Sequence, residues 1–205
     1  MTLYTNGHNA CANGLAALIT HISVHNGVPD TAGSNEVAGT TRAAVAWTTL
    51  NGVIDNTGQV AHAMAAGDAV SFYGLFGAAS GGTFYGYVPR CGVGQSRSGF
   101  GSVDAAGVTA NNIQSAAHGL TDTDTVIVSN VLGEALPTGL TEGTIYFVVG
   151  ATTDTFQLSL TLAGAAINIT AQGELYFARF VTETFASPGN LVAAAGAIDV
   201  NLATV

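Results

Sequence analysis

Five histidines are the residues most suited to chemistry in this chain, because imidazole binds metals and exchanges protons near neutral pH. His21 and His25 lie four positions apart, the spacing at which two ligands on one helix face hold a zinc ion. Ile22 and Val24, however, alternate with polar residues as in a strand, where residues four apart are separated by about 13 Å. The segment also lacks an HExxH motif. We therefore predict no metal site and no cofactor.

Other motifs indicate turns rather than catalysis. His118 belongs to an AHGL sequence, where we expect its ring to hydrogen-bond the backbone. Asp122 and Asp124 resemble the start of a calcium loop, but the further oxygen ligands and terminal glutamate of such a loop are missing. The stretch GVGQSRSG (Gly92–Gly99) has no phosphate-binding lysine, and no serine stands in a GxSxG elbow. We predict that the protein is not an enzyme.

Aromatic residues gather between positions 72 and 87 and allow two interpretations. A strand places alternate side chains on opposite faces, so one parity of this series fills a core. The other parity, Tyr73, Tyr85 and Tyr87, would then form a platform for a sugar or a partner subunit, because tyrosine combines a large contact area with a polar tip. Core filling is the simpler interpretation, and the three tyrosines are the candidate binding surface.

Charge is scarce along the chain. Of 205 residues, 48% are hydrophobic and only 8% are charged, where an ordinary globular protein has about 25%. The net charge is −9, and four arginines supply all the positive charge, which excludes a basic cluster for nucleic acid or an anionic membrane surface. We expect no membrane span, which needs ~20 apolar residues, and no secretory signal in MTLYTNGHNAC. Cys11 and Cys91 could form a disulfide, but we expect two buried thiols.

Hydrophobic spacing predicts one helix and many strands. We expect one short helix over about Asn9–Ile19, because apolar residues recur at helical spacing, at Cys11, Leu15, Leu18 and Ile22. The period then changes to two, in short segments separated by glycine-rich turns. This pattern is typical of an all-β protein, with an antiparallel β-sandwich as its body. The expected strands include segments near 45–47, 60–64, 70–76, 84–88, 125–129, 144–149, 155–160, 166–170 and 198–202.

A break in composition divides the chain. The sequence CGVGQSRSGFG at 91–101 shows no alternation, and a self-contained set of strands follows it. The pattern changes again after residue 173, before the last alternating strand. Exposed loops tolerate insertion of whole domains. We therefore predict a discontinuous body, a linker and an inserted β-module, which comprise residues 1–90 plus 174–205, 91–102 and 103–173, respectively.

Two stretches resemble phage protein families. The middle, Val103 to Gly173, resembles a small β-module that recurs in tail and other virion proteins of bacteriophages, through AHGL, ALPTGL, GTIYFVV, DTFQLS and GAAINIT in that order. The body resembles a phage family described as tail-fibre-like, in SVHNGVPDTAGSNEV, GLFGAASGGTFYG and ETFASPGNLVAAAGAIDVNL. In that family the glycine-rich hairpin runs directly into the closing strands. The resemblance therefore implies that the middle module is an insertion.

These resemblances imply a non-enzymatic structural component of a bacteriophage virion, tail-associated or fibre-like, assembled in the host cytoplasm. Such a protein acts by self-association and by docking to other virion proteins, and symmetric homo-oligomers are the usual arrangement. Two alternatives stay open. One is a head decoration protein that cements the capsid, and the other is a receptor- or glycan-binding module at the tail tip. We expect neither nucleic acid nor membrane as a partner.

Overall fold

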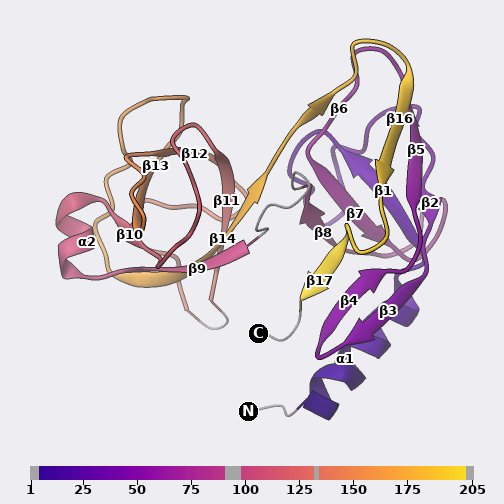
Figure 1. The fold of residues 1–205 in the computed structure, drawn as a ribbon, viewed down its shortest axis with the longest axis horizontal. Coiled ribbons are helices and arrows are strands. Elements are labelled where there is room, and N and C mark those ends of the chain that lie inside the picture. Colours follow the sequence, from indigo (N-terminus) through magenta and orange to yellow (C-terminus); the bar gives the residue numbers. More distant parts are fainter. Residues whose placement is uncertain (1–4, 91–97, 132–133, 202–205) are drawn as a thin grey trace. The chain divides into compact units, whose positions relative to one another are not determined.

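The computed structural model describes residues 5–90, 98–131 and 134–201 (Figure 1). These residues form two helices, α1 (Thr5–Leu18) and α2 (Ala105–Ala110), and seventeen strands whose pairings are all antiparallel. The predicted all-β class with an N-terminal helix is confirmed. The chain divides into two compact units. We call residues 1–90 with 182–205 the body, and residues 91–181 the barrel.

The barrel is larger than the module predicted from the sequence. Strands β9 (Ser98–Val103) and β14 (Gly173–Phe180) pair with each other from Ser98 to Val103, and both are barrel strands. The predicted linker over 91–102 is therefore wrong from residue 98 onward, and residues 91–97 lie outside the described ranges. The predicted return to the body at 174 is also wrong, because the body resumes at Thr182.

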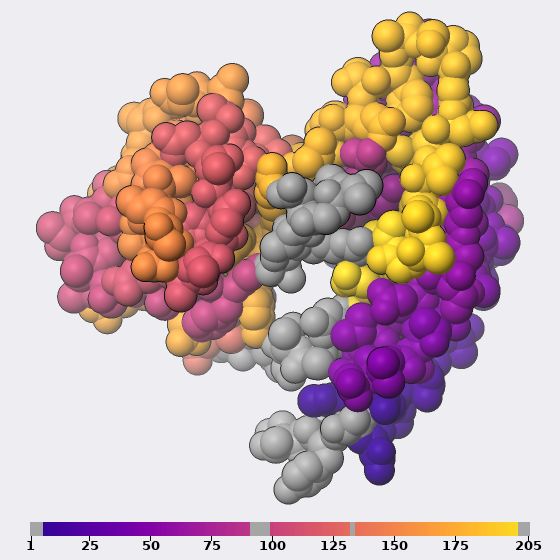
Figure 2. Space-filling view, viewed as in Figure 1, coloured from indigo at the N-terminus to yellow at the C-terminus, as the bar shows by residue number. Residues whose placement is uncertain are grey.

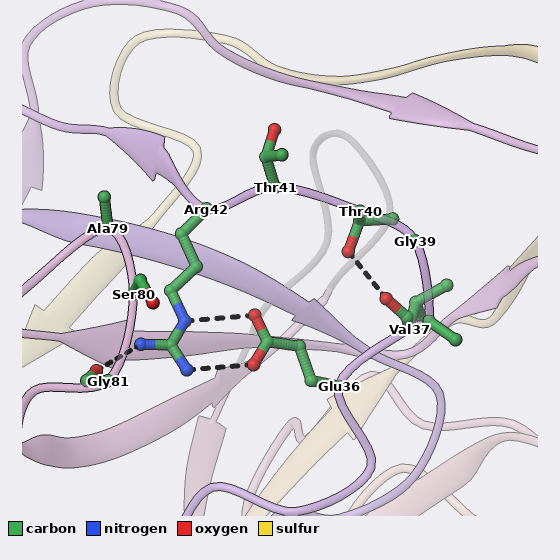
Figure 3. A pocket seen from close by; sticks show the side chains of 10 residues that line it. Glu36, Val37, Gly39, Thr40, Thr41, Arg42, Ala79, Ser80 and Gly81 are labelled. Atoms are coloured by element: carbon green, nitrogen blue, oxygen red, sulfur yellow. Dashed lines mark hydrogen bonds and ion pairs between the residues drawn. The ribbon is translucent and has the colours of Figure 1, made fainter.

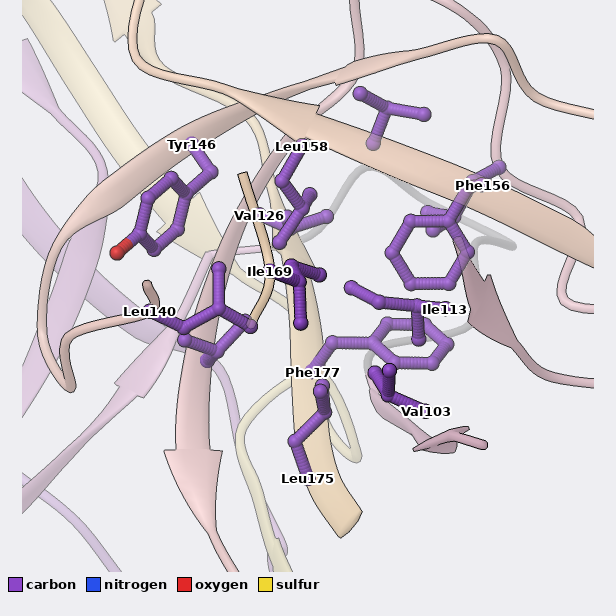
Figure 4. Close-up of a cluster of buried hydrophobic side chains, with 13 residues drawn as sticks. Val103, Ile113, Val126, Leu140, Tyr146, Phe156, Leu158, Ile169, Leu175 and Phe177 are labelled. Carbon is purple, nitrogen blue, oxygen red and sulfur yellow. The ribbon is translucent and has the colours of Figure 1, made fainter. Parts of the chain in front are cut away.

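Six strands close the barrel in the order β10-β13-β12-β11-β14-β9. The other four are β10 (Ile113–Gln114), β11 (Thr125–Asn130), β12 (Ile145–Val149) and β13 (Thr155–Ser159). Apolar side chains from every strand fill the interior, with Phe156 and Phe177 packed edge to face at 5.0 Å between centroids (Figure 4). Tyr146 is also buried, and its hydroxyl accepts a hydrogen bond from Thr141 N at 2.8 Å. The polar tip of this core residue is thus satisfied.

Two glycines let β9 lie close against the barrel core. At Gly99 a Cβ atom would lie 2.4 Å from the Phe177 ring, and at Gly101 it would lie 2.6 Å from Ile113 Cγ2. The larger residues of the sequence SGFGSV therefore alternate with glycines that leave room for neighbouring side chains. Glycine at every second position marks a tightly packed strand here, not a linker.

Gly101→Ala is expected to destabilise the barrel by about 1–3 kcal/mol, because overpacking forces the fully buried, β-branched Ile113 to move. Ser102→Ala, on the outer face of the same strand, is the matched control, with an expected change within about 0.5 kcal/mol. Chemical denaturation followed by far-UV circular dichroism measures both free energies of unfolding. Equal stabilities would contradict the close packing at Gly101.

One predicted strand does not form. Residues 166–170 lie in an irregular segment of the barrel, although Ile169 is only 1% exposed. Ile169 N donates to Asn111 Oδ1 at 2.9 Å, and Ile167 N donates to the Leu158 carbonyl oxygen at 2.7 Å. The alternation of this segment reflects burial of its apolar residues. Its backbone N–H groups donate hydrogen bonds to separate parts of the barrel and form no β-ladder.

Four antiparallel sheets surround one apolar core in the body, in the orders β2-β1-β7-β8, β17-β4-β3, β16-β5 and β15-β6. In the last three, a strand that follows the barrel in sequence pairs with one that precedes it, and Figure 2 shows the yellow C-terminal segment lying along the purple strands. The strands are β1 (His21–His25), β2 (Ala43–Ala44), β3 (Trp47–Leu50), β4 (Val53–Asn56), β5 (Val60–Met64), β6 (Ala69–Val70), β7 (Phe72–Phe76), β8 (Phe84–Pro89), β15 (Glu183–Thr184), β16 (Gly189–Ala193) and β17 (Asp199–Asn201).

Helix α1 packs on β3 and β4 with a face that only partly matches the predicted one, since Leu15 contacts the body core as expected. Ala12 and, just past the helix, Ile19 are buried, whereas Leu18 is 51% exposed and Cys11 is also exposed. The inward face is rotated relative to the prediction, since Ala12, Leu15 and Ile19 recur at helical spacing and face the core. The expectation of a buried thiol is wrong for Cys11, and Cys91 lies outside the described residues.

Candidate functional site

The three candidate tyrosines do not form one platform. The register of β7 and β8 pairs Tyr73 with Val88 and Gly74 with Tyr87, so Tyr73 and Tyr87 project from opposite faces of the sheet. Tyr73 is 5% exposed in the body core, Tyr87 is half-buried, and Tyr85 is 36% exposed. The prediction of a shared face is wrong because odd-numbered residues of β7 pair with even-numbered residues of β8 here.

The structure instead brings a serine and a histidine together on the second face of this sheet. Ser23 Oγ lies 2.6 Å from His25 Nε2, two positions along β1. His25 Nδ1 lies 2.8 Å from the Ser34 carbonyl oxygen, which only accepts, so Nδ1 carries the proton and Nε2 accepts from the hydroxyl. Burial lowers the pKa of His25, which favours the neutral ring. Two polar residues at i and i+2 on a strand are the sequence signal for this contact.

This pair has the hydrogen-bonding order of a nucleophile and its general base, but it is closed to substrate. Ser23 and His25 are 1% and 0% exposed. A Cβ atom at Gly74 would lie 2.3 Å from His25 Nε2 and 2.4 Å from Ser23 Oγ, and the Phe76 ring is stacked parallel to the imidazole. The arrangement leaves no space for a reacting carbonyl group. It supports a structural role, in which His25 holds the following loop to the sheet.

That loop, residues 26–42, covers the second face of β1 and β7, and we call it the cover loop. Gly33 has a φ of 78°, and a Cβ atom there would lie 2.6 Å from Phe76 Cζ. The backbone therefore approaches the aromatic ring more closely than any larger residue allows. Asn35 Nδ2 donates to the Val28 carbonyl oxygen at 2.8 Å and ties the two arms of the loop together.

Arg42 fixes the far end of the cover loop (Figure 3). Its Nε and Nη2 donate to the two carboxylate oxygens of Glu36 at 3.0 and 2.9 Å, and Nη1 donates to the Gly81 carbonyl oxygen at 2.5 Å. The guanidinium carbon lies 3.3 Å from the centroid of the Phe76 ring. Only arginine combines a bidentate ion pair with stacking in this way. Between this arm and residues 79–81 lies a surface hollow of about 380 Å³.

A second buried histidine contacts the cover loop. His62, on β5, is 3% exposed, and its Nδ1 lies 3.1 Å from the Thr41 carbonyl oxygen. Its Nε2 has no hydrogen-bond partner within the described ranges. Burial lowers the pKa of His62, against smaller opposing effects of the Thr41 hydrogen bond and the Glu36 charge. Two neutral imidazoles therefore hold the cover loop, one near its middle and one near its end.

The candidate metal ligands have other partners. His21 Nδ1 hydrogen-bonds Thr20 Oγ1. His118 hydrogen-bonds two backbone groups of the barrel, which confirms the predicted turn role. Asp122 and Asp124 accept hydrogen bonds from backbone N–H groups. Within residues 5–90, 98–131 and 134–201, no cluster of three His, Cys, Asp or Glu is placed to hold a metal ion.

No family model matches the chain, and no curated protein or solved structure is similar enough to count as a match. In the part of the chain that the structure describes, no helix is long and apolar enough to cross a membrane. The role of the molecule must therefore be inferred from its own contacts and surface chemistry.

Proposed function

We propose that this chain is a non-enzymatic structural component of a bacteriophage virion, tail-associated or fibre-like, that self-associates and docks onto other virion proteins. The resemblance of the body and barrel sequences to phage protein families supports a location in the virion. The closed Ser23–His25 pair supports a role without catalysis, because it is the arrangement nearest to a nucleophile and base and it excludes substrate.

The observation that carries the proposal is a charge-poor surface with exposed apolar side chains on both units. Protein interfaces are depleted in charge at their centres, and exposed apolar side chains mark them when they gather in patches. The arginines that the structure describes form ion pairs inside the chain, namely Arg42–Glu36, Arg90–Glu183 and Arg179–Asp124. Large apolar side chains that stay exposed include Leu50 and Val192 in the body and Leu160 and Leu162 in the barrel.

The turn after β13 is the best-defined docking feature. Leu160 and Leu162 are 62% and 61% exposed on it. Thr161 N donates to Ser159 Oγ at 3.2 Å, and Gly164 N donates to the Thr161 carbonyl oxygen at 3.0 Å. Because the turn is held by its own hydrogen bonds, the two leucines are presented in an ordered conformation. Less conformational entropy is then lost when they dock.

Replacing both leucines, Leu160→Ser with Leu162→Ser, is expected to weaken self-association at least about tenfold, since burial of one leucine contributes about 1.5–3 kcal/mol. Sedimentation equilibrium over a range of concentrations measures the dissociation constant. Leu18→Ser in the body, at similar exposure, is the control and should leave it unchanged. A wild-type chain that is monomeric at every concentration would contradict the self-association.

The place in the virion is tested by electron microscopy of phage particles labelled with antibodies against the whole chain. Label along the tail is the expected result. Label over the head would replace the tail assignment with capsid decoration, and particles that carry no label would overturn the structural role altogether.

A further inference from the structure

Two aromatic side chains lie next to each other on the outer surface of the barrel. Phe100 of β9 is paired in register with Tyr176 of β14. Phe100 is 45% exposed and Tyr176 is half-buried, and their ring centroids lie 5.8 Å apart at an interplanar angle of 68°. The two rings therefore form an aromatic corner in which nearly half of the Phe100 side chain stays exposed.

The barrel core does not use this exposed ring, whose described contact within the fold is the cross-strand pair with Tyr176. The interior beside β9 is filled by Phe177, Leu175 and Ile113, which project toward Gly99 and Gly101. Phe100 lies between these glycines and projects to the other face, where the barrel has no core. A large aromatic side chain kept at such a position is typical of a recognition surface.

Polar groups suited to hydroxyl ligands surround the aromatic corner. Glu174 is exposed and pairs with Ser102 one step along the same face, and Gln114 pairs with Ser102 from β10. Ser129 of β11 pairs with Tyr176 on the opposite side. The described side chains around the corner thus offer carboxylates, an amide and hydroxyls: Glu174 is exposed, and the side chain of Asp104, also exposed, is hydrogen-bonded to that of Gln114.

We propose that Phe100 and Tyr176 form a binding platform for a sugar ring of a neutral glycan, with Glu174 and its neighbours accepting hydrogen bonds from the sugar hydroxyls. The C–H groups on one face of a pyranose carry partial positive charge and complement the negative face of an aromatic ring. A few polar groups around an apolar contact then set orientation. This recognition role is separate from the assembly contacts proposed above.

The charge of the face selects this occupant over other stacking ligands. A nucleotide also stacks on aromatic rings, but its phosphates would meet Glu174 and a chain with a net charge of −9. An acidic saccharide meets the same repulsion. A neutral saccharide carries no charge to be repelled, and its hydroxyl groups donate to the carboxylate.

The test uses the full-length chain and a panel of neutral oligosaccharides, which includes hexamers of glucose, mannose, galactose and N-acetylglucosamine. Saturation-transfer NMR detects binding, and titration calorimetry measures the dissociation constant. Phe100→Ala is expected to weaken binding about tenfold or more, by analogy with the loss of an aromatic side chain that stacks on a nucleic-acid base. Phe100→Trp should retain binding, and Tyr85→Ala in the body should leave it unchanged.

Each other outcome overturns the proposal. If no oligosaccharide of the panel binds, the protein does not bind a neutral glycan. If wild type and Phe100→Ala bind with equal affinity, Phe100 is not part of the binding site. If Tyr85→Ala abolishes binding instead, the glycan contacts the body. If Phe100→Ala weakens self-association without any glycan binding, the corner is a subunit interface. Circular dichroism of both alanine variants excludes misfolding as the cause.

Discussion

Removal of residues 91–181, with Arg90 joined to Thr182 by a short Gly/Ser linker, is expected to leave a folded body. The two ends created by this deletion already lie close together. Arg90 N donates to the Ser71 carbonyl oxygen at 2.8 Å, and Thr182 Oγ1 lies 2.7 Å from Ser71 Oγ. Arg90 also forms an ion pair with Glu183. Because both ends contact the same residue, a few glycines span the gap at a small cost in loop-closure entropy.

Trp47 provides a signal specific to the body, because it is the only tryptophan of the chain. Its indole Nε1 donates to the Ile19 carbonyl oxygen at 2.7 Å, and its ring packs against the body core. The deletion variant is expected to show one cooperative fluorescence transition in denaturant, with a midpoint close to that of the full chain. A variant without a transition would show that the body depends on the barrel.

A chain that stops after Val181 is the opposite control and is expected to have no folded body. It lacks β15, β16 and β17, which pair with β6, β5 and β4. Leu191 and Ile198, which are 1% and 0% exposed, also leave the core. Loss of each such side chain costs about 2–5 kcal/mol, against a total stability of about 5–15 kcal/mol for a domain. Trp47 emission should then match that of the denatured chain.

Alternation in the sequence predicts the strands whose two faces differ in burial. In β5, Val60, His62 and Met64 are buried and the residues between them are exposed. The closing strand likewise places Val200 opposite Ile54, so the end of the chain returns to the body as its pattern predicts. These elements are predictable because a one-residue slip in register would expose every apolar side chain.

The same reasoning fails where the partner of a residue determines its role. The glycines of β9 suggest a flexible linker when the sequence is taken alone. In the structure, Phe177 and Ile113 occupy the space that side chains at Gly99 and Gly101 would fill. The Ser23–His25 contact depends on the Ser34 carbonyl, nine positions away in the cover loop. Helix α2 is not among the predicted elements, although Asp104 provides a local signal for it, because it caps the helix and accepts from Gly107 N at 2.7 Å. Local signals of this kind are predictable, whereas close contacts between loop and sheet are not.

Acidification is expected to destabilise the body through His25 and His62. Burial lowers the pKa of both groups below the ordinary value of 6.5, which they regain in the unfolded chain. The unfolded state therefore binds more protons once the pH falls below about 6.5. Stability is fully present above that pH and is lost as the pH falls toward the folded-state pKa values. The maximal slope is about 1.4 kcal/mol per pH unit for each proton, or roughly twice that for both groups.

The charges around the two imidazoles modulate this loss without reversing it. Glu36 favours the protonated form of both rings, and Arg42 opposes protonation of His25. Because Arg42 and Glu36 are themselves paired, their effects on His25 partly cancel. Protonated His62 would also carry an N–H group at Nε2 with no hydrogen-bond acceptor in the described structure, which adds the cost of an unsatisfied buried donor.

The measurement is the free energy of unfolding from Trp47 fluorescence between pH 8 and pH 5. His62→Asn keeps an N–H donor near the Thr41 carbonyl oxygen but removes the titrating group. This variant should be less stable than wild type at pH 8, because the ring leaves a cavity, and should lose about half of the acid sensitivity. His118→Asn, in the barrel, should leave the pH profile of the body unchanged. If His62→Asn and wild type lose stability with the same slope, protonation of His62 does not destabilise the body.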